Sequence, residues 1–330
     1  MKIAVTGANG FIGGQICKDL LAEGHAVAGL VYQNCSADPG SQIEIIRGSI
    51  LDKEVVLELV QGADVVIHTA AKISVNGDPD GSVHRTNVEG TRIVANACLK
   101  VGVKRLVHIS SIHSMQHPSD DSVFDETRPE AVAKFGPYGM SKAAGEKAIQ
   151  EAVKKGLNAI ILNPVAVVGP MDMSPSATGK ALLDLYFKKF PVLIEGGYDF
   201  VDVRDVAKAV ISAMKLGRSG ERYIISGEYL SIRRMAALVE KFTGSKQPNI
   251  FLPNWIQWVG LPFITAKAKL TGSEPMYTSE VILTTAQGKN ISCEKATKEL
   301  DYNPRPLEES IRDTLHWLIQ NLPETLNLKP

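Results

Sequence analysis

The sequence predicts an α/β fold built on a doubly wound parallel sheet, and two observations lead to it. Short apolar runs alternate with helix-like patterns from residue 1 to about residue 165, an order that places parallel strands between two layers of helices. The first strand-to-helix connection carries three glycines, spaced as in a tight turn that leaves its backbone accessible. A length of 330 residues leaves room for a second, smaller unit.

Strands and helices are expected to follow one another along this first half. Ile12, Ile16 and Leu20 recur every four residues after the first strand, which is typical of a helix with one buried face. Pro137 begins the last helix of the series and Gly156 follows its end, the usual places for these residue types. The expected strands cover residues 3–5, 26–31, 43–46, 65–67, 106–109 and 159–162, and the expected helices cover 12–21, 53–61, 86–101 and 137–155.

Composition narrows the class of protein. Lys plus Arg and Asp plus Glu both number 36, so the net charge is zero, which argues against a general nucleic-acid binder and an acidic disordered chain. The four cysteines form no CxxC pair, so we expect a reducing, cytoplasmic location and no metal site. We expect no membrane span and no signal peptide, because no apolar run is long enough for either.

The glycine-rich turn predicts a dinucleotide site. Residues 5–13 have the sequence VTGANGFIG between the first strand and the first helix. In this arrangement Gly7 permits the tight turn, Gly10 lets the backbone approach a pyrophosphate, and Gly13 lets the helix pack close to the sheet. The helix N-terminus then offers free N–H groups and a positive dipole to the phosphates.

The end of the second strand leaves the choice of dinucleotide open. An acid there binds the ribose 2′-hydroxyl of NAD, whereas an Arg nearby accepts the 2′-phosphate of NADP. Residues 31–34 have the sequence VYQN, which contains neither, and the first acid after them is Asp38. This position therefore does not decide between NAD and NADP.

A Tyr and a Lys four residues apart suggest acid–base chemistry. Tyr138 and Lys142 fall in the first turns of the helix that begins at Pro137, on the same face. A nearby ammonium lowers the pKa of a phenol, which can then give or take a proton at a carbonyl or alcohol oxygen. Ser110 and Ser111 follow the fifth strand, at the edge of the sheet where such folds bind ligands.

Taken together, these segments resemble the extended short-chain dehydrogenase/reductase superfamily, of the NAD-dependent epimerase/dehydratase type, over essentially the whole chain. The NPVAVVGP segment and the C-terminal segment look most like the dihydroflavonol-4-reductase group, and 3β-hydroxysteroid dehydrogenases and hopanoid-associated sugar epimerases are related groups. The matching segments are residues 6–14, 64–71, 87–91, 108–111, 138–142, 163–170, 200–209 and 295–318.

The resemblance implies a role for each matched residue. Tyr138 would be the acid/base, Lys142 would bind the ribose and tune Tyr138, and Ser111 would hold the substrate oxygen. The implied cofactor-binding residues are Gly7, Asn9, Gly10, Phe11, Ile12, Gly13, Tyr32, Ser49, Ile50, Ala70, Ala71, Lys72, Tyr138, Lys142, Pro164, Val165 and Val167. The substrate-binding residues would be Ser111, His113, Met171 and Tyr198.

Two positions depart from the pattern that the resemblance implies. Ser49 stands where similar proteins often carry an Asp that contacts adenine, and Tyr32 stands where many reductases carry an Arg. We nevertheless lean to NADP over NAD, because the group that the chain resembles most uses NADP.

The resemblance also implies a division of the chain. Residues 1–165 would form an NAD(P)-binding Rossmann domain, with residues 200–226 returning to it, and residues 166–330 would mainly form the smaller C-terminal substrate-binding domain. By analogy, the helices 86–101 and 137–155 would form a homodimer interface. The stretch 255–269 is apolar with interleaved polar residues, so it is either a surface helix over the pocket or a contact with a membrane surface.

The predicted activity is reduction of a ketone or aldehyde with a nicotinamide cofactor, reversible on the alcohol. The scarcity of charged residues near the expected pocket favours an uncharged or apolar carbonyl compound over a nucleotide sugar. Dehydratases of the superfamily carry Asp-Glu after the catalytic Ser/Thr, where this chain has Ile112-His113. The alternatives are a sugar-nucleotide epimerase that uses the same residues, a 3β-hydroxysteroid dehydrogenase-like enzyme, and a non-catalytic NAD(P) sensor.

Overall fold

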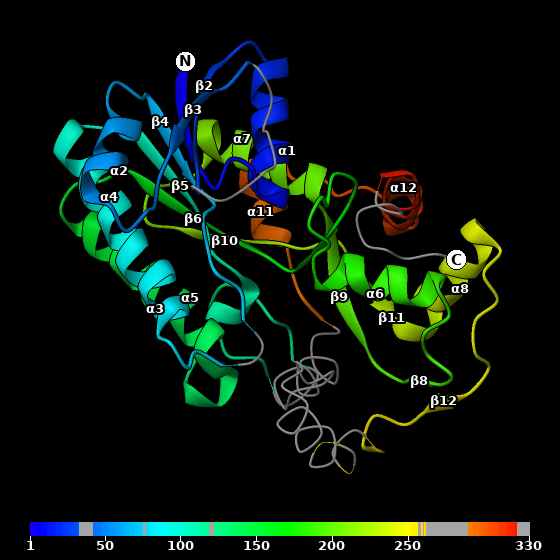
Figure 1. Ribbon diagram of the computed structural model, residues 1–330. Helices are drawn as coiled ribbons and strands as arrows, with labels where there is room; N and C mark the ends of the chain where they lie inside the picture. Colours follow the sequence, from blue (N-terminus) through cyan, green and yellow to red (C-terminus); the bar gives the residue numbers. More distant parts are fainter. Residues whose placement is uncertain are drawn as a thin grey trace.

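A parallel β-sheet forms the centre of the computed structural model, which describes residues 1–32, 42–74, 77–118, 122–256, 259, 261 and 290–321. Within these residues the sheet has seven strands in the order β10-β6-β5-β4-β1-β2-β3, and each pair of neighbours is parallel. This confirms the predicted α/β, doubly wound fold (Figure 1). The strands are β1 (Lys2–Thr6), β2 (Ala26–Val31), β3 (Glu44–Arg47), β4 (Val65–His68), β5 (Arg105–Ile109), β6 (Ala159–Pro164) and β10 (Arg222–Ile225).

Helices cover both faces of the sheet, and each face has its own apolar core. Side chains of α1 (Phe11–Ala22), α7 (Val203–Leu216) and α11 (Glu294–Leu300) pack on one face. Side chains of α2 (Lys53–Val60), α4 (Thr91–Val101) and α5 (Gly136–Lys154) pack on the other. The strands are therefore buried on both sides, which explains why they are continuous apolar runs in the sequence.

The helix expected over residues 86–101 begins with a different geometry. The short α-helix α3 (Ser82–His84) leads into a π-helix, Arg85–Gly90, and the α-helical geometry resumes at Thr91. The side chain of Asn87 in the π-helix donates to the carbonyl of Lys72 and to Ser141 Oγ, both at 2.9 Å. These contacts require Asn87 to face the sheet edge, and single π-turns commonly occur at such functional positions.

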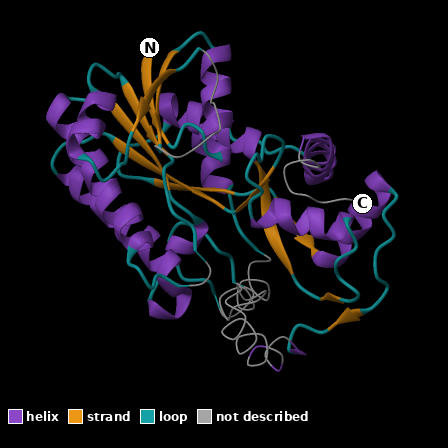
Figure 2. Cartoon of the chain, viewed as in Figure 1, coloured by secondary structure: helices purple, strands orange, loops and turns teal. Residues whose placement is uncertain are grey.

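A second unit with its own core follows β6. Its three-stranded sheet has the order β11-β9-β7, and Figure 2 shows it beside the main sheet with helices packed on it. This unit's core is largely separate from the two cores of the main sheet. Its elements are β7 (Ala166–Val168), α6 (Ala177–Tyr186), β8 (Leu193–Ile194), β9 (Gly197–Asp202), β11 (Glu228–Ser231), α8 (Ile232–Thr243), β12 (Phe251–Leu252) and α12 (Leu307–Asn321).

No helix in the described part of the chain is long and apolar enough to cross a membrane. The stretch 255–269, for which the sequence predicts a helix over the pocket or a contact with a membrane surface, lies almost entirely outside the described residues. Asp38 and residues 33–34 lie wholly outside them.

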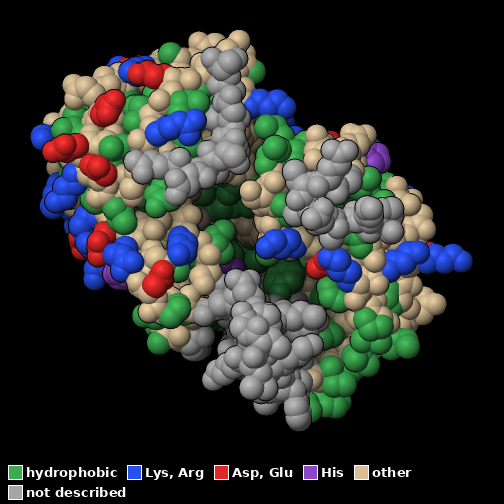
Figure 3. Space-filling model, in the orientation of Figure 1, with side chains coloured by type: hydrophobic (Ala, Val, Ile, Leu, Met, Phe, Trp, Pro, Cys, Tyr) green, Lys and Arg blue, Asp and Glu red, His purple; other side chains and the backbone are tan. Residues whose placement is uncertain are grey.

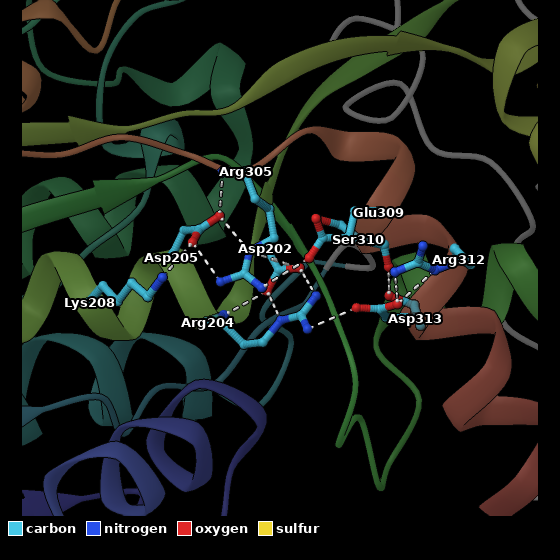
Figure 4. A network of polar contacts seen from close by, with 10 residues as sticks. Asp202, Arg204, Asp205, Lys208, Arg305, Glu309, Ser310, Arg312 and Asp313 are labelled. Atoms are coloured by element: carbon cyan, nitrogen blue, oxygen red, sulfur yellow. Dashed lines mark hydrogen bonds and ion pairs between the residues drawn. The ribbon is translucent and has the colours of Figure 1, made fainter. Parts of the chain in front are cut away.

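A network of ion pairs joins the two units, and Figure 4 shows it. The fully buried carboxylate of Asp202, at the end of β9, accepts from Arg204 Nη2 at 2.7 Å. Arg204 also reaches Asp313 of α12 at 2.9 Å, and Arg305 reaches Asp205 of α7 at 2.8 Å. Burial alone would raise the pKa of Asp202, but hydrogen bonds from Arg204 hold it below its ordinary value. The network thereby fixes α12 to the start of α7, which packs against the main sheet.

We expect the substitution Asp202→Asn to destabilise the protein by about 3 kcal/mol, since removing one member of a buried ion pair leaves the partner charge uncompensated. The deficit should shrink as the pH falls below about 4, because the depressed pKa of Asp202 stabilises the fold only while the carboxylate is ionised. Urea unfolding at several pH values measures both effects.

Arg233→Gln is the matched control, because it breaks the exposed ion pair with Glu195 and should cost no more than about 1 kcal/mol. Equal losses of unfolding free energy in the two variants would show that the buried network stabilises the fold no more than an exposed ion pair does.

Candidate active site

The carboxyl ends of four strands bring the predicted site residues to one edge of the sheet. Thr6 at the end of β1 lies in register with His68 of β4, and His68 lies in register with His108 of β5. Ile109 of β5 lies in register with Leu162 of β6. The residues that follow these strands, which include the glycine turn, Ala70, Ser111 and Val165, therefore lie along the same edge, where open α/β sheets bind their ligands.

The glycine turn has the shape that a pyrophosphate requires. Gly7 adopts a left-handed backbone with a φ of 68°, and its N–H donates to the carbonyl of Leu30 in β2 at 3.0 Å. A Cβ on Gly13 would lie 2.1 Å from the carbonyl oxygen of Gly7, so only glycine fits there. No side chain caps the N-terminus of α1, where Gly10 is the N-cap. The free N–H groups of this helix end suit the phosphates of a dinucleotide.

The other candidates for cofactor binding surround this turn. Tyr32 is largely exposed directly after β2, and Ser49 Oγ accepts from the N–H of Leu51 at 3.1 Å in the turn after β3. Ile50 is buried beneath Gly90. The candidates Asn9, Phe11 and Ile12 are partly buried in the turn or the first turn of α1, Ala70 is partly buried after β4, and Ala71 and Lys72 are exposed there.

Asn87 fixes the segment after β4. Its Oδ1 accepts from the N–H of Lys72 at 2.8 Å, and its Nδ2 donates to the carbonyl of the same residue at 2.9 Å. A side-chain amide that satisfies both backbone groups of one residue holds that segment in an extended course. The path past Ala70 and Lys72 is therefore set by the π-helix that carries Asn87.

Lys142 is buried against the end of β5. Its side chain extends from α5, and Nζ donates to the carbonyl of Ile109 at 3.0 Å. Burial lowers the pKa of Lys142 to about 8, and the charge of Glu146 acts in the opposite direction. The rings of His68 and His108 stack nearby with centroids 5.1 Å apart, and burial lowers the pKa of His68 to about 3, with the charge of Lys142 adding to the effect. These histidines are therefore neutral near pH 7.

Ser111 is buried at the start of the loop after β5. Its Oγ accepts from the N–H of His113 at 3.2 Å and caps the short 3-10 helix Ile112–Ser114. Its carbonyl accepts from Asn163 Nδ2 at 3.0 Å. Because Oγ accepts a hydrogen bond from the backbone, its own O–H remains available to donate to another oxygen.

Tyr138 is partly buried in the first turn of α5, with aromatic rings beside it. The ring of His113 meets it edge-on at a centroid distance of 6.1 Å, and the ring of His117 lies 5.4 Å from His113. Burial lowers the pKa of His113 to about 4 and that of His117 to about 3, with His113 adding to the effect at His117. The two histidine rings on this side of Tyr138 are therefore uncharged near pH 7.

The remaining candidates lie at the end of β6 and in the second unit. Pro164 ends β6, Val165 is buried and its N–H donates to the carbonyl of Ile225 at 3.2 Å, and Val167 lies in β7. Met171 follows β7, and its sulfur lies 3.9 Å from Lys18 Nζ of α1. Tyr198 lies in β9, where its ring contacts Phe200 of the second core.

Two buried polar residues of this region, Glu146 and Asn163, were not predicted from the sequence. Asn163 Nδ2 reaches Glu146 Oε1 at 2.6 Å and Ser114 Oγ at 3.0 Å. The spacing of Glu146, four residues after Lys142 on the same helix, was the available signal. Asn163 stands in an apolar strand, and only the packing of α5 on β6 reveals its partners.

The chain is similar in sequence and structure to known proteins. A model of the NAD dependent epimerase/dehydratase family matches residues 3–226. Sterol demethylase protein B of Methylococcus capsulatus is 29% identical, over 96% of this chain and 98% of its own length. Cinnamoyl-CoA reductase 1 of Oryza sativa is 30% identical, over 69% of this chain and 72% of its own length. The crystal structure of gox2253 has a TM-score of 0.85 and 31% identity, with 98% of each chain covered.

We expect Gly13→Ala to disrupt the glycine turn, since its Cβ would overlap the carbonyl oxygen of Gly7. The melting temperature should fall, and the stabilising effect of added dinucleotide should be lost. Gly14→Ala is the matched control, because its Cβ would lie an ordinary 3.6 Å from the carbonyl of Ala8. That variant should melt at or above the parent temperature, since Ala is a better helix former than Gly. Similar melting temperatures for both variants would contradict the close contact at Gly13.

Proposed function

We propose that this protein is an oxidoreductase of the dihydroflavonol-4-reductase type. The chain belongs to the NAD dependent epimerase/dehydratase family, because the model of that family matches most of its residues. The proposed reaction is the reduction of a ketone or aldehyde to its alcohol, or the reverse. The observation that carries the proposal is the burial of Lys142 against the carbonyl of Ile109. Lys142 lies four residues after Tyr138 on α5, and Ile109 lies two residues before Ser111.

The residues at the sheet edge suit a nicotinamide dinucleotide. When bound, this cofactor supplies or accepts the hydride. The uncapped N-terminus of α1, with Gly7, Gly10 and Gly13, would hold the pyrophosphate. The other proposed contacts are Asn9, Phe11 and Ile12 at the pyrophosphate; Tyr32, Ser49, Ile50, Ala70, Ala71 and Lys72 on the adenosine side; and Tyr138, Lys142, Pro164, Val165 and Val167 on the nicotinamide side.

In the proposed reaction Tyr138 donates its phenolic proton to the substrate oxygen as that oxygen becomes an alcohol. The ammonium of Lys142, on the same face of α5, stabilises the tyrosinate left behind. The hydroxyl of Ser111 donates a hydrogen bond to the same oxygen, since the bond that its oxygen accepts from the N–H of His113 leaves the O–H free to donate. In the oxidation of an alcohol each of these proton movements runs in reverse.

The surroundings of Tyr138 support an uncharged, apolar substrate. His113 and His117 present neutral rings on the loop after Ser111, and we propose His113, Met171 and Tyr198 as substrate contacts from the two units. The relative named for a sterol demethylase protein agrees with a substrate of this kind. The division of the chain stays a prediction, with residues 1–165 and 200–226 as the cofactor domain and residues 166–330 as mainly the substrate domain. A homodimer that forms through α4 and α5 also stays a prediction.

Sugar-nucleotide epimerisation is less well supported by the arginines in and beside the second unit. A nucleotide diphosphate needs arginines or lysines to bind its phosphates. In the described residues Arg204 and Arg305 are held in the buried network, and Arg233 and Arg234 pair with Glu195 and Glu228. This pairing favours a carbonyl compound without phosphates.

For the cofactor we propose NADP, on account of Arg47. This residue ends β3 in register with Val31, the last residue of β2, and the N–H of Gly48 donates to the carbonyl of Val31 at 3.0 Å. Arg47 shares its strand face with Ile45, which packs on the α1 side of the sheet. It is exposed and has no ion pair within the described residues. An Arg beside the end of β2 is suited to a ribose 2′-phosphate.

We expect Arg47→Gln to weaken the binding of NADPH about tenfold, the effect of losing one charge-assisted hydrogen bond, and to leave the affinity for NADH unchanged. Isothermal titration calorimetry with each dinucleotide measures the ratio. Arg92→Gln, at an exposed position of α4, is the control and should alter neither affinity. A parent protein that prefers NADH would overturn the choice of NADP.

We expect Tyr138→Phe to lower the rate of carbonyl reduction by about 10²-fold or more, since it removes the proton donor. The measurement is the oxidation of NAD(P)H in the presence of a panel of ketones, aldehydes and sterols. Tyr186→Phe is the control, because this tyrosine packs on Phe187 in the second unit, and it should keep the parent rate. Full activity of Tyr138→Phe would refute the assignment, and a parent that retains bound NAD without net redox turnover would favour the epimerase.

A further inference from the structure

A buried chain of polar contacts runs beneath the proposed active site. The carbonyl of Ser111 accepts from Asn163 Nδ2 at 3.0 Å, and the same nitrogen reaches Glu146 Oε1 at 2.6 Å. The second oxygen of Glu146 lies 3.6 Å from Arg222 Nη2. Asn163 is fully buried and Glu146 is 3% exposed. The chain links β5, β6, β10 and α5.

A buried carboxylate is costly unless nearby positive charge and hydrogen bonds compensate it. Arg222 compensates one oxygen of Glu146 and the Asn163 amide satisfies the other. Lys142 lies one helical turn before Glu146 on α5 and contributes a second positive charge. An apolar residue at position 146 would avoid this cost altogether, which points to a role for the charge itself.

We propose that Glu146 is a positioning residue for the proposed reaction, which holds the backbone of Ser111 through Asn163 and keeps the neighbouring Lys142 in its ammonium form. The inference rests on the proposed function, in which Ser111 and Lys142 act on the substrate and the cofactor.

The electrostatic part follows from what surrounds Lys142. The groups around its ammonium include the carbonyl of Ile109 on β5, the neutral rings of His68 on β4 and His108 on β5, and Glu146 on α5. The phenol of Tyr138, one helical turn earlier on α5, is neutral before the proposed proton transfer. Among these, Glu146 alone carries a negative charge. Burial already lowers the pKa of Lys142 to about 8. Without the charge of Glu146 the pKa would fall further, and the lysine would lose its proton at a pH where the parent keeps it.

The geometric part follows from the position of Asn163. Its amide nitrogen contacts the carbonyl of Ser111 and Ser114 Oγ, the two ends of the turn that presents the Ser111 hydroxyl and His113. Glu146 is the third partner of the same nitrogen, and a charged acceptor forms the strongest of such hydrogen bonds. Glu146 therefore sets the direction of the Asn163 amide, and the amide sets the place of the turn.

Glu146→Gln separates the two effects, since it removes the charge and keeps a side-chain oxygen that can accept from Asn163. The ionisation of Lys142 can be followed by NMR on the free protein labelled with ¹³C at lysine, with its signal identified by its absence in Lys142→Met. We expect the parent midpoint near pH 8 and the Glu146→Gln midpoint about one pH unit lower. The exposed Glu151→Gln on the same helix is the control and should match the parent. An unchanged midpoint in Glu146→Gln would overturn the electrostatic part.

Glu146→Ala removes the acceptor as well and tests the geometric part. We expect hydrogen exchange followed by mass spectrometry to show faster exchange in a peptide covering residues 110–118, with Glu146→Gln and Glu151→Ala like the parent. Asn163→Ala, which removes the contact from the other side, should show the same local increase and replaces Glu146→Ala if that variant does not fold. An increase spread over the whole sheet, or no increase, would reduce Glu146 to a general structural residue.

Both measurements use the free protein, so their outcome is separate from that of the proposed function. A protein that binds neither NADP(H) nor NAD(H) would refute the proposed function and leave the contacts of Glu146 as measured. A protein that binds the cofactor and shows neither change in Glu146→Gln and Glu146→Ala would refute this inference alone.

Discussion

The hydrogen bond from the Lys142 ammonium to the carbonyl of Ile109 joins α5 to the last residue of β5. A cation buried to this degree needs a fixed acceptor, because its desolvation costs several kcal/mol. The need for that acceptor ties the first turns of α5 to the end of β5 within hydrogen-bonding distance. Tyr138 belongs to those turns and Ser111 follows that strand. One polar contact therefore determines how Tyr138, the proposed proton donor, lies relative to Ser111, which is proposed to hydrogen-bond to the substrate oxygen.

A second set of contacts holds α5 from the opposite side. Asn87 in the π-helix donates to Ser141 Oγ, next to Lys142 in the sequence. A Cβ on Gly145 would lie 2.8 Å from the carbonyl oxygen of Asn87, so glycine at that position lets the two helices approach closely. Asn87 also fixes Lys72 after β4. The edge of the sheet on the cofactor side and the helix with the acid–base pair are thus set by the same residue.

The sequence was sufficient for six of the seven strands of the central sheet and for the order of Gly7, Ser111, Tyr138 and Lys142 along it, because periodic apolar runs and short motifs are local signals. The seventh strand, β10, follows the second unit's segments and was expected only as part of a return of residues 200–226 to the first domain. The sequence was insufficient for the partners of those site residues. The acceptor of Lys142 is a backbone carbonyl, which every residue has and which no pattern distinguishes. The π-helix at Asn87 looks like the start of an ordinary helix in sequence, since its geometry comes from contacts with Lys72 and Ser141. The role of Arg47 depends on the register between β2 and β3, which only the structure gives.

The net charge of zero is reflected in ion pairs, because many of the positive side chains lie beside carboxylates. In the second unit the described arginines are committed to carboxylates, either in the buried network around Asp202 or in surface pairs. At the sheet edge the neutral ring of His113 meets Tyr138, and the neutral ring of His117 lies beside His113. Of the positive charges named at the proposed site, Lys142 is buried beside the reacting groups, whereas Lys72 and Arg47 lie on the adenosine side of the cofactor edge. A substrate without charge fits this distribution, since recognition would depend on apolar contact and on the hydrogen bonds of Ser111 and Tyr138 to one carbonyl oxygen.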